Sequence, residues 1–476
     1  MKCERQKLYR EKKRIVLDKI NGGHGACYGL LYKYGNILIQ RNEGTIALIK
    51  AERPSISINP IFQRFFFCFL AQRTRYLEGC RSFIGFNGCH LKGPFGGVLL
   101  FAVALDANSG IFPIVVYAYE GENTDSWKWF LHLLKEQVEE ETRRITFMSD
   151  RQKGIITSLS DHFPNSLNRF CARHMYANFK CKYPGLKLRN QFWATVRATQ
   201  PIVFRQRMEE IKALSREAYN WLLDVPPFHW LRHVFDEKAK NDHMTNNMTE
   251  SFNSQLGAAR QKSILSLLEH IRRKVMKSLR TSSKKGANWP TEIPPRVQKT
   301  VDKNLVFSRH IDVIFAGDNE YELKEETKIF IANLVDKTCE CKAWQISGIP
   351  CKHAVACIQR NRLDITSFIH PSLSKTMYLK TYGGMIHPIP NQASWPDTPY
   401  DTLLPPFVKK KPRRPKLSRM RAADENENRR SYTLKCGVCK GFGHNKRTCP
   451  QASSKNNNSI PNEVHSMIYF VDFANY

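Results

Sequence analysis

Two groups of cysteine and histidine residues have the spacing of zinc ligands. Their members are Cys339, Cys341, Cys351 and His353 in the first group, and Cys436, Cys439, His444 and Cys449 in the second. Three thiolates and one imidazole complete a tetrahedral Zn²⁺ site and leave no open position for a substrate. We therefore expect two structural zinc sites, each of which supplies folding free energy to a short segment. A hairpin with buried free thiols is the alternative for the first group, and it leaves His353 unexplained.

Three positions far apart in the chain have the arrangement of a two-metal phosphoryl-transfer site. Such sites need carboxylates that converge from separate elements on Mg²⁺ or Mn²⁺. Asp150 ends a predicted strand, Glu250 lies near the start of a predicted helix, and the strand that should neighbour Asp150 carries Asn87 at its centre. An amide oxygen has no charge and binds a hard cation far more weakly than a carboxylate. We expect a site that is degenerate at position 87, with Mg²⁺ or Mn²⁺ as cofactors only if the three positions still function.

The elements that would position these residues follow from short apolar runs separated by Gly, Asn and Ser. The sequence predicts strands and helices in the order 81–90 (strand), 96–107 (strand), 111–121 (strand), 122–141 (helix), 143–150 (strand), 152–163 (helix) and 166–175 (strand). Three antiparallel strands followed by crossovers indicate a mixed α/β sheet. With a turn near 92–97, Asp106 would pair near Ser82, on the order of 16 Å along the strand from Asn87, so it cannot replace the missing acid.

The stretch from about 81 to 255 resembles the Mutator-like (MULE, MuDR) DDE transposases of plants. The segments that match are IGFNGCHLKGPFGG, VALDANSG, ENTDSWKWFLHLLKE, ITFMSDRQKGI, FCARHMYANFK and NNMTESFN. The order of modules is also similar, with a SWIM-type zinc finger (CECKAW…GIPCKHA) and then a CCHC zinc knuckle (CGVCKGFGHNKRTC). Over about residues 1–450, the resemblance implies cut-and-paste DNA chemistry by a triad. Asp150 and Glu250 match its second and third acids, Asn87 falls on the first, and a C-x2-H element maps onto Cys171 and His174.

The fold class implied is α/β: an RNase H-like mixed sheet with a helical insertion, followed by small zinc-stabilised modules. The expected domains are an N-terminal flanking helical region (1–75), a transposase-like core (76–285) with its insertion (about 175–245), a SWIM module (300–370), a Pro-rich and basic linker (371–432), a zinc knuckle (433–452) and a tail (453–476). The segment 246–280 is predicted as one long helix that carries Glu250.

The charge of the chain favours a polyanion as partner. There are 74 Lys and Arg residues against 43 Asp and Glu residues, a net charge of +31. No segment reaches the roughly 20 apolar residues that a membrane span needs, so we expect DNA rather than a membrane, with RNA as an alternative ligand of the zinc knuckle. The basic residues expected at nucleic acid are Lys409, Lys410, Lys411, Arg413, Arg414, Lys440, Lys446 and Arg447. The run KKKPRRPK also suits nuclear import, so the nucleus is the expected location, and a homo-oligomer stays open.

These observations predict a transposase-derived protein that binds zinc and nucleic acid, with catalysis impaired at Asn87. One alternative is an active DDE transposase that cleaves and transfers DNA strands with a divalent metal. The other is an adaptor whose SWIM module binds proteins. A net charge of this size is a statement about association and not about fold, so the charge alone does not separate these functions.

Overall fold

A computed structural model describes residues 23–139, 143–150, 153–407, 436–439 and 441. The chain divides into two units, residues 1–415 and residues 416–476. Everything described up to residue 407 belongs to the first unit. None of the helices formed by the described residues combines the length and the apolar character that a membrane span requires.

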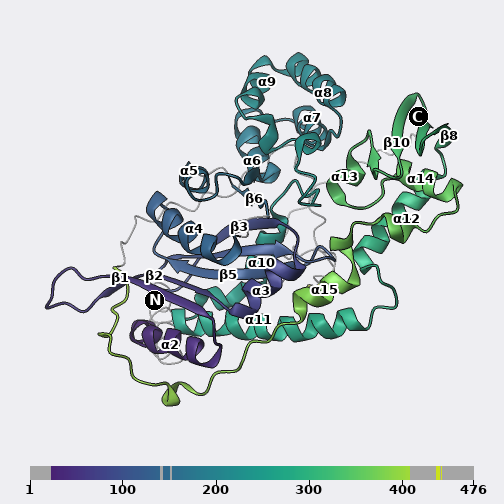
Figure 1. Cartoon of the computed structure of the whole chain (residues 1–476). Helices are drawn as coiled ribbons and strands as arrows, with labels where there is room; N and C mark the ends of the chain where they lie inside the picture. Colours follow the sequence, from purple (N-terminus) through teal and green to yellow (C-terminus); the bar gives the residue numbers. More distant parts are fainter. Residues whose placement is uncertain (1–22, 140–142, 151–152, 408–435, 440, 442–476) are drawn as a thin grey trace, which may run out of the picture. The chain divides into compact units, whose positions relative to one another are not determined.

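A seven-stranded mixed sheet forms the core of the first unit (Figure 1). Its strands are β1 (Ile46–Glu52), β2 (Ile61–Cys68), β3 (Phe83–His90), β4 (Val98–Leu105), β5 (Ile111–Tyr119), β6 (Thr146–Ser149) and β7 (Leu167–Phe170). They lie in the order β1-β2-β5-β4-β3-β6-β7, with β3, β6 and β7 parallel and the other neighbours antiparallel. The five strands from β5 to β7 have the antiparallel-then-parallel order expected of an RNase H-like sheet, so the predicted fold class is confirmed.

The first 75 residues differ from the helical flanking region that the sequence predicted. Their described part contains helices α2 (Leu31–Arg41) and α3 (Leu70–Gly79), but β1 and β2 between them extend the main sheet beyond β5. In β2 every residue except Gln63 is buried, including Arg64, Phe65, Phe66 and Phe67. A strand that is covered on both faces shows no apolar–polar alternation, which is why its sequence did not reveal it.

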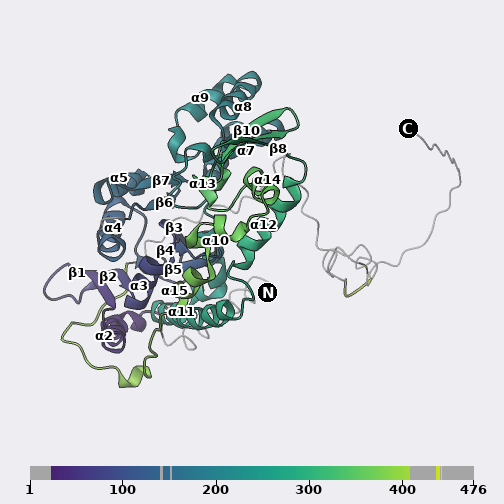
Figure 2. The ribbon, with the colours of Figure 1, turned by 45° about the vertical axis from the view of Figure 1, so that its right-hand side comes forward.

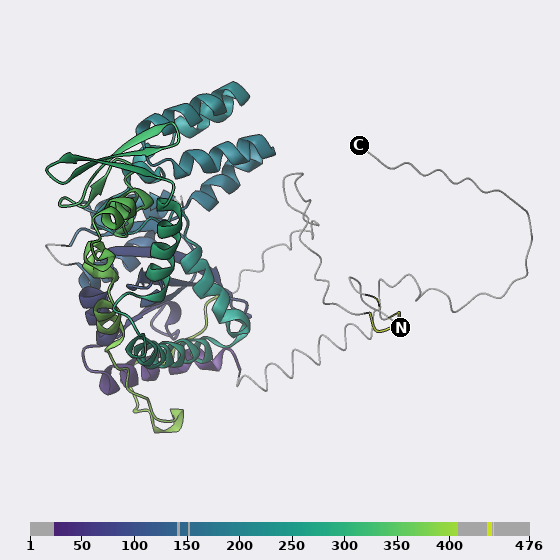
Figure 3. The same cartoon turned by 90° about the vertical axis from the view of Figure 1, so that its right-hand side faces the viewer.

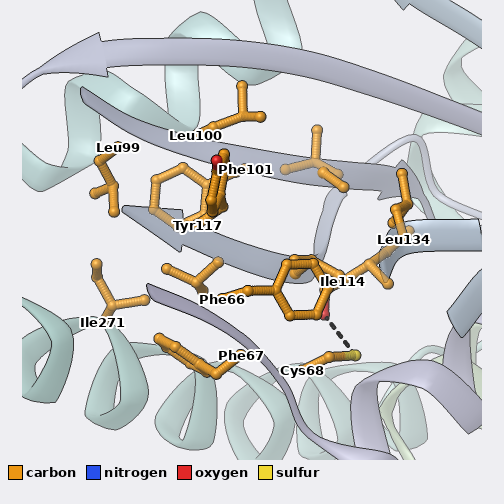
Figure 4. Close-up of a cluster of buried hydrophobic side chains, with 14 of the residues drawn as sticks. Phe66, Phe67, Cys68, Leu99, Leu100, Phe101, Ile114, Tyr117, Leu134 and Ile271 are labelled. Carbon is orange, nitrogen blue, oxygen red and sulfur yellow. Dashed lines mark hydrogen bonds between the residues drawn. The ribbon is translucent and has the colours of Figure 1, made fainter. Parts of the chain in front are cut away.

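Helices cover both faces of this sheet. Helix α4 (Thr124–Val138) packs on one face, where its Phe130 ring lies 5.2 Å from Tyr117 and 5.7 Å from Phe86. Helices α10 (Asn247–Leu256) and α11 (Ile264–Ala287) cover the other face (Figure 3). There the Phe252 ring lies 4.7 Å from Phe101. Figure 4 shows part of the buried core between these layers, where the Cys68 thiol donates to the Ile114 carbonyl.

Asn123 is the N-cap of helix α4. Its side chain accepts a hydrogen bond from the Ser126 amide, while the Ser126 hydroxyl accepts one from the Asn123 amide. This reciprocal pair satisfies two backbone donors that a helix leaves open at its start. Asp125 instead binds the buried Arg64 of β2, which also pairs with Glu120. The acid is therefore part of a structural ion pair.

A bundle of helices follows β7, as predicted for residues 175–245. It comprises α6 (Ala172–Lys182), α7 (Leu186–Arg197), α8 (Pro201–Leu214) and α9 (Arg216–Leu223), and Trp230 is buried at its centre. Helix α5 (Lys153–His162) precedes β7. The predicted fifth strand is too long, because β7 ends at Phe170 and Cys171 is the N-cap of α6. His174 therefore lies on a helix and not on a strand.

The predicted long helix over 246–280 is also divided. Helix α10 ends at Leu256, a 3-10 turn spans Gly257–Gln261, and α11 begins at Ile264. Gly257 has a φ of +44°, in the left-handed region that only glycine adopts without strain. The break ends α10, which packs on β3, before α11 begins.

A second, four-stranded sheet follows α12 (Pro295–Ser308), in the order β11-β10-β9-β8. Its elements are β8 (Asp312–Gly317), β9 (Glu320–Glu325), β10 (Lys328–Asn333), β11 (Thr338–Cys339), α13 (Ala343–Ser347) and α14 (Lys352–Arg360), followed by α15 (Lys375–Tyr382). Other short 3-10 helices span Ala26–Leu30, Pro227–His229, Arg232–Val234, Ile365–Phe368, Pro371–Leu373 and Gln392–Ser394.

The segment after α15 returns to the beginning of the main sheet. Trp395 packs on Tyr34 of α2, with ring centroids 5.5 Å apart, and Tyr400 packs on Tyr32. The Leu404 amide donates to the Pro60 carbonyl and its own carbonyl accepts from Phe62 at the start of β2. Part of the stretch that the sequence predicted as a linker is thus packed against the N-terminal elements.

Candidate metal centres

The first Cys/His group forms one cluster. The ligand atoms of Cys339, Cys341, Cys351 and His353 all lie within 4.8 Å of one another, and the Cys339 sulfur lies 3.6 Å from His353 Nδ1. Within the part of the chain that the structure describes, it is the one group of three or more Cys, His, Asp or Glu residues with this geometry. Residues that the spacing predicted as ligands are therefore brought together.

Local sequence explains how the four ligands converge. Cys339 ends β11, and Lys342 adopts a left-handed φ of +59° that turns the chain just after Cys341. After α13, Gly348 provides a second left-handed turn that returns the chain to the cluster. Cys351 is then the N-cap of α14, since its sulfur accepts a hydrogen bond from the Ala354 amide, and His353 lies in the first turn of that helix.

The electrostatics of the cluster fit a cation. Hydrogen bonds with Cys341 and Cys351, together with burial, raise the pKa of the Cys339 thiol, whereas the hydrogen bond with Cys339 lowers the pKa of Cys341. Three buried thiols in contact cannot all ionise unless a positive charge balances them. Zn²⁺ supplies that charge and takes three thiolates and one imidazole in a closed tetrahedron. The donor set therefore suits zinc in a structural role.

A fifth residue supports this cluster and was missed from the sequence. The Nε2 atom of His353, on the opposite side of the ring from Cys339, lies 3.2 Å from the Glu325 carboxylate at the end of β9. Lys352 pairs with the same carboxylate, and Phe330 stacks on the imidazole with ring centroids 4.1 Å apart. A carboxylate in this position fixes the ring and its tautomer for a ligand histidine. No spacing rule points to Glu325, because it comes from a different strand.

Only the start of the second Cys/His group lies within the described residues. Cys436 is buried, and its sulfur accepts a hydrogen bond from the Val438 amide at 3.4 Å. The Cys436 amide donates to the Gly441 carbonyl, so the C-x2-C segment forms a tight turn. The other residues that the sequence predicted as ligands of the second zinc site or as contacts with nucleic acid lie outside the described residues: His444, Cys449, Lys409, Lys410, Lys411, Arg413, Arg414, Lys440, Lys446 and Arg447.

Strand register places position 87 beside Asp150. β3 and β6 pair in parallel with Phe83 opposite Thr146 and Gly85 opposite Met148, and the same register continued by two residues brings position 87 level with Asp150. Across β4, Asn87 pairs with Phe101, whose ring contacts Phe252 of α10. Because directly paired residues share one face of a sheet, position 87 lies on the face that α10 covers.

Helix α10 lies directly against β3 and carries Glu250 in its first turn. The Asn246 side chain donates to the Phe86 carbonyl at 2.7 Å, which fixes the start of the helix on the strand. Gly85 allows this approach, since a Cβ atom there would lie 2.4 Å from the Met248 side chain. The structure thus brings Glu250 to the same face of the sheet as position 87.

Glu250 and Asp150 share His174 as a neighbour. The Glu250 carboxylate lies 2.5 Å from the Arg173 guanidinium and 3.9 Å from His174 Nε2. The Cys171 thiol beside the ring raises the pKa of His174, and the negative charges of Asp150 and Glu250 raise it further. The charges of both predicted acids thus act on the same imidazole, and Glu250 is already paired with a cation.

The C-x2-H element joins β7 to α10. The Asn246 amide donates to the Cys171 sulfur at 3.2 Å, which connects the residue after β7 to the residue that caps α10. Burial tends to raise the pKa of Cys171, but the hydrogen bonds from His174 and Asn246 outweigh it and lower the pKa. These contacts are those of residues that position Glu250 and do not by themselves form a metal site.

Asp106 does not approach position 87. β3 pairs with β4 so that Ile84 lies opposite Ala104, and Asp106 follows beyond the end of that ladder. It is buried and accepts hydrogen bonds from the amides of Asn108 and Gly110 and from the Tyr382 hydroxyl. Burial raises the pKa of Asp106, which is consistent with a carboxyl group that shapes the β4–β5 turn.

Both of these regions match models of known protein families. Residues 83–178 match the family model of the MULE transposase domain, and residues 318–360 match that of the SWIM zinc finger. The chain carries a MULE transposase domain and a SWIM zinc finger. The MULE match runs from β3 to α6 and includes position 87, Asp150 and Cys171, while the SWIM match includes Glu325 together with the four clustered ligands. No curated protein matches the chain significantly.

Proposed function

We propose that this protein is a transposase-derived DNA-binding protein whose metal-dependent strand cleavage is impaired, and in which zinc holds the SWIM module together. The observation that carries the proposal is the identity of position 87. The strand register brings this position to Asp150 and to the face under α10, where a two-metal site would need a carboxylate, and the residue is asparagine.

The expected consequence for chemistry is a large loss of metal affinity. Two divalent cations in a phosphoryl-transfer site are held mainly by the negative charge of their ligands. Here Asn87 contributes no charge, and Arg173 neutralises much of the charge of Glu250. Asp150 is then the main acid left to attract a cation, and one carboxylate does not organise two metal ions around a reacting phosphate.

DNA as partner is supported by charge and by the type of domain. The net charge of +31 favours a polyanion, and the MULE transposase domain itself suggests DNA binding. The basic run at 409–414 supports the nucleus as location, and the C-x2-C turn at Cys436 and Cys439 supports a second zinc site in the C-terminal unit. RNA binding and self-association have no support beyond the sequence.

A strand-cleavage assay tests the catalytic part. Wild-type protein, Asn87→Asp and Asp150→Ala are incubated with DNA and Mg²⁺ or Mn²⁺, and the products are resolved on a denaturing gel. We expect no cleavage by the wild type and a gain of cleavage in Asn87→Asp that the double variant with Asp150→Ala lacks. Cleavage by the wild type that disappears in Asp150→Ala would show an active transposase instead.

Two further measurements test the other parts. DNA affinity should fall steeply as salt rises, because contacts of Lys and Arg with phosphates release counterions. An affinity that does not respond to salt would favour an adaptor that binds proteins.

Metal analysis of the intact chain should return about two zinc ions, one for each group of four ligands. A value near one would remove one of the two zinc sites from the proposal.

A further inference from the structure

A cleft of about 770 Å³ lies between the helical insertion and the SWIM module. Helices α7 and α8 form one wall with Arg197 and Arg207, and β10 and α14 form the other with Lys328 and Lys352. These elements lie close to one another in Figures 1 and 2. Arg296, at the start of α12, also lines the cleft. The site is separate from the face of the sheet that carries position 87.

The lining of this cleft is strongly basic. Seven Arg and Lys side chains face it, against two carboxylates, those of Asp242 and Glu325. Both carboxylates are already paired, Asp242 with Arg232 at 2.8 Å and Glu325 with Lys352. No carboxylate among the described residues pairs with Arg197 or Lys328. Arg207 pairs with Glu210 at 2.8 Å. Among the described residues, the positive charge of the cleft that no ion pair neutralises therefore comes from Arg81, Arg197, Arg296 and Lys328.

Two of these seven residues, Arg81 and Arg296, make hydrogen bonds only with neutral groups. Arg81 is 5 % exposed and donates to the carbonyls of Lys240 and Asp106 and to the Ser109 hydroxyl, while its Nε atom has no partner. The Arg296 guanidinium donates to the Ser109 carbonyl at 2.7 Å. A carbonyl orients a guanidinium but does not cancel its charge, so both residues contribute to the potential of the cleft.

His243 also lines the cleft, and the positive charge of the arginines affects its pKa. Burial lowers its pKa, and the charges of Arg81, Arg169 and Arg296 lower it further, against the opposing charge of Asp242. The imidazole is therefore held neutral beside this group of arginines. It offers a neutral donor or acceptor in a cleft where basic groups otherwise predominate.

We propose that this cleft binds the phosphodiester backbone of DNA, and so gives the proposed DNA-binding function, on which this inference rests, a defined site. Cations on both walls suit a strand that passes between them, because each nucleotide presents a negative charge. Guanidinium groups match the paired oxygens of a phosphate. The insertion and the zinc module then bind DNA jointly.

The zinc cluster is part of this site. Cys341, Cys351 and His353 line the cleft, and Lys352 lies between the last two ligands. The wall that carries Lys352 depends on α14, which begins at a zinc ligand. Loss of zinc should therefore weaken DNA binding even though the metal does not contact the phosphate.

The test uses the full zinc-loaded chain and a fluorescent DNA duplex. Arg197→Gln/Lys328→Gln removes one cation from each wall, and neither change leaves a carboxylate without its partner. The matched control is Arg205→Gln/Lys324→Gln, which changes exposed residues of α8 and β9 outside the cleft and removes the same charge. Equal melting temperatures of the three proteins establish that each is folded.

We expect the cleft variant to bind DNA about tenfold or more weakly than the control at moderate salt. The slope of log affinity against log salt should become smaller by about 2, since each phosphate contact contributes about 0.9. If the wild type binds DNA but both variants weaken it equally, the cleft is not the site and this inference is overturned while the proposed function stands. If the wild type does not bind DNA at all, the proposed function fails first.

A second arm separates a DNA backbone from a free phosphate group. Inorganic phosphate is added at constant ionic strength, and the melting temperature of each protein is measured. A rise for wild type and control but not for the cleft variant, together with unchanged DNA affinity of the cleft variant, would show that the cleft takes a small phosphate compound and would overturn the proposal. Loss of DNA affinity in the cleft variant supports it.

Discussion

The SWIM cluster and the group formed by position 87, Asp150 and Glu250 differ in how their residues are assembled. The four zinc ligands come from one short stretch, are buried, and contact one another directly. Position 87, Asp150 and Glu250 come from β3, the end of β6 and α10, and the residues between them are those of a large apolar core. Zinc in the first group stabilises its own module. The fold that positions the second group, in contrast, does not depend on those residues.

This difference means that the residue at position 87 can change without loss of the fold. Asn87 lies within the paired ladder of β3 and β4, whose backbone hydrogen bonds do not depend on the side chain. An asparagine keeps the shape of an aspartate and removes repulsion from neighbouring acids. A change at Cys341 or His353, in contrast, would remove the metal on which its surroundings depend. Four predictions test this contrast.

The largest effect is expected from Cys341→Ser. Structural zinc contributes apparent binding free energy on the order of 10 kcal/mol to a small module, so this variant should lose one zinc ion and lose hydrogen-exchange protection across 312–360, while β3 to β5 remain protected. The control is Cys181→Ser, which changes an exposed thiol. Metal analysis and hydrogen exchange with mass spectrometry provide the measurement, and full zinc content in Cys341→Ser would break the contrast.

Glu325→Gln should have the next largest effect. It removes the carboxylate that contacts the outer nitrogen of His353, and such changes weaken metal binding about 10- to 100-fold. Glu322→Gln on the same strand is the control, because Glu322 is exposed. Zinc affinity is measured by competition with a chromogenic chelator. Equal affinities of the two variants would mean that His353 is oriented by other groups.

A fall in pH should affect the stability of the main core and that of the zinc cluster differently, and Glu269 on α11 tests the core. Burial tends to raise the pKa of Glu269, but hydrogen bonds from Arg272 and Arg273 lower it below its ordinary value of 4.5. Its contribution to stability is therefore present above pH 4.5 and is lost as the pH falls through the lower folded pKa.

Zinc release, in contrast, begins as soon as ligand thiolates and imidazole take up protons. Glu269→Gln should lower the free energy of unfolding of the core by roughly 1–2 kcal/mol at neutral pH, with a smaller difference below pH 4.5, while Glu209→Gln on the exposed face of α8 should change little. Denaturant titration at several pH values checks this. A difference that grows in acid would contradict the sign.

The smallest effect is expected from Asn87→Asp without metal. A new carboxylate level with Asp150 should reduce stability by about 0.5 kcal/mol, since like charges on neighbouring strands repel. Mn²⁺ should reverse the loss in proportion to its binding, and Asn87→Asp/Asp150→Asn serves as the control with unchanged charge. Thermal denaturation with and without Mn²⁺ shows this. Equal stabilisation of the wild type by Mn²⁺ would mean that position 87 does not limit metal binding.

Sequence reasoning identified the elements that turn residues separate clearly. Strands β3, β4 and β5 and helix α4 follow the predicted segments closely, because Gly, Asn and Ser mark their ends. Strand β2 was missed because IFQRFFFC is apolar on both faces and has no period by which to tell it from a helix. The end of β7 was misplaced because the change of direction at Cys171 depends on Asn246, far away in the chain.

For the candidate sites, too, residues with a local spacing pattern were predicted and residues that act through long-range contacts were not. The ligands from Cys339 to His353 were predicted because their spacing is local and the structure confirms their convergence. Glu325 and Arg173 were not predicted, since each acts through a contact with a residue on a different element. Local spacing reveals a closed metal site, whereas the charges that surround it or compete with it become visible only in three dimensions.

The return of residues 386–404 to α2 and β2 has a consequence for synthesis of the chain. Leu404 exchanges backbone hydrogen bonds with Pro60 and Phe62, and Trp395 and Tyr400 cover the tyrosines of α2. On the ribosome, α2 and β2 are made early, but these partners leave the exit tunnel only after the entire SWIM module has been translated. The N-terminal elements must therefore wait with part of their apolar surface uncovered, and a nascent chain that stops before Leu404 would present that surface to chaperones.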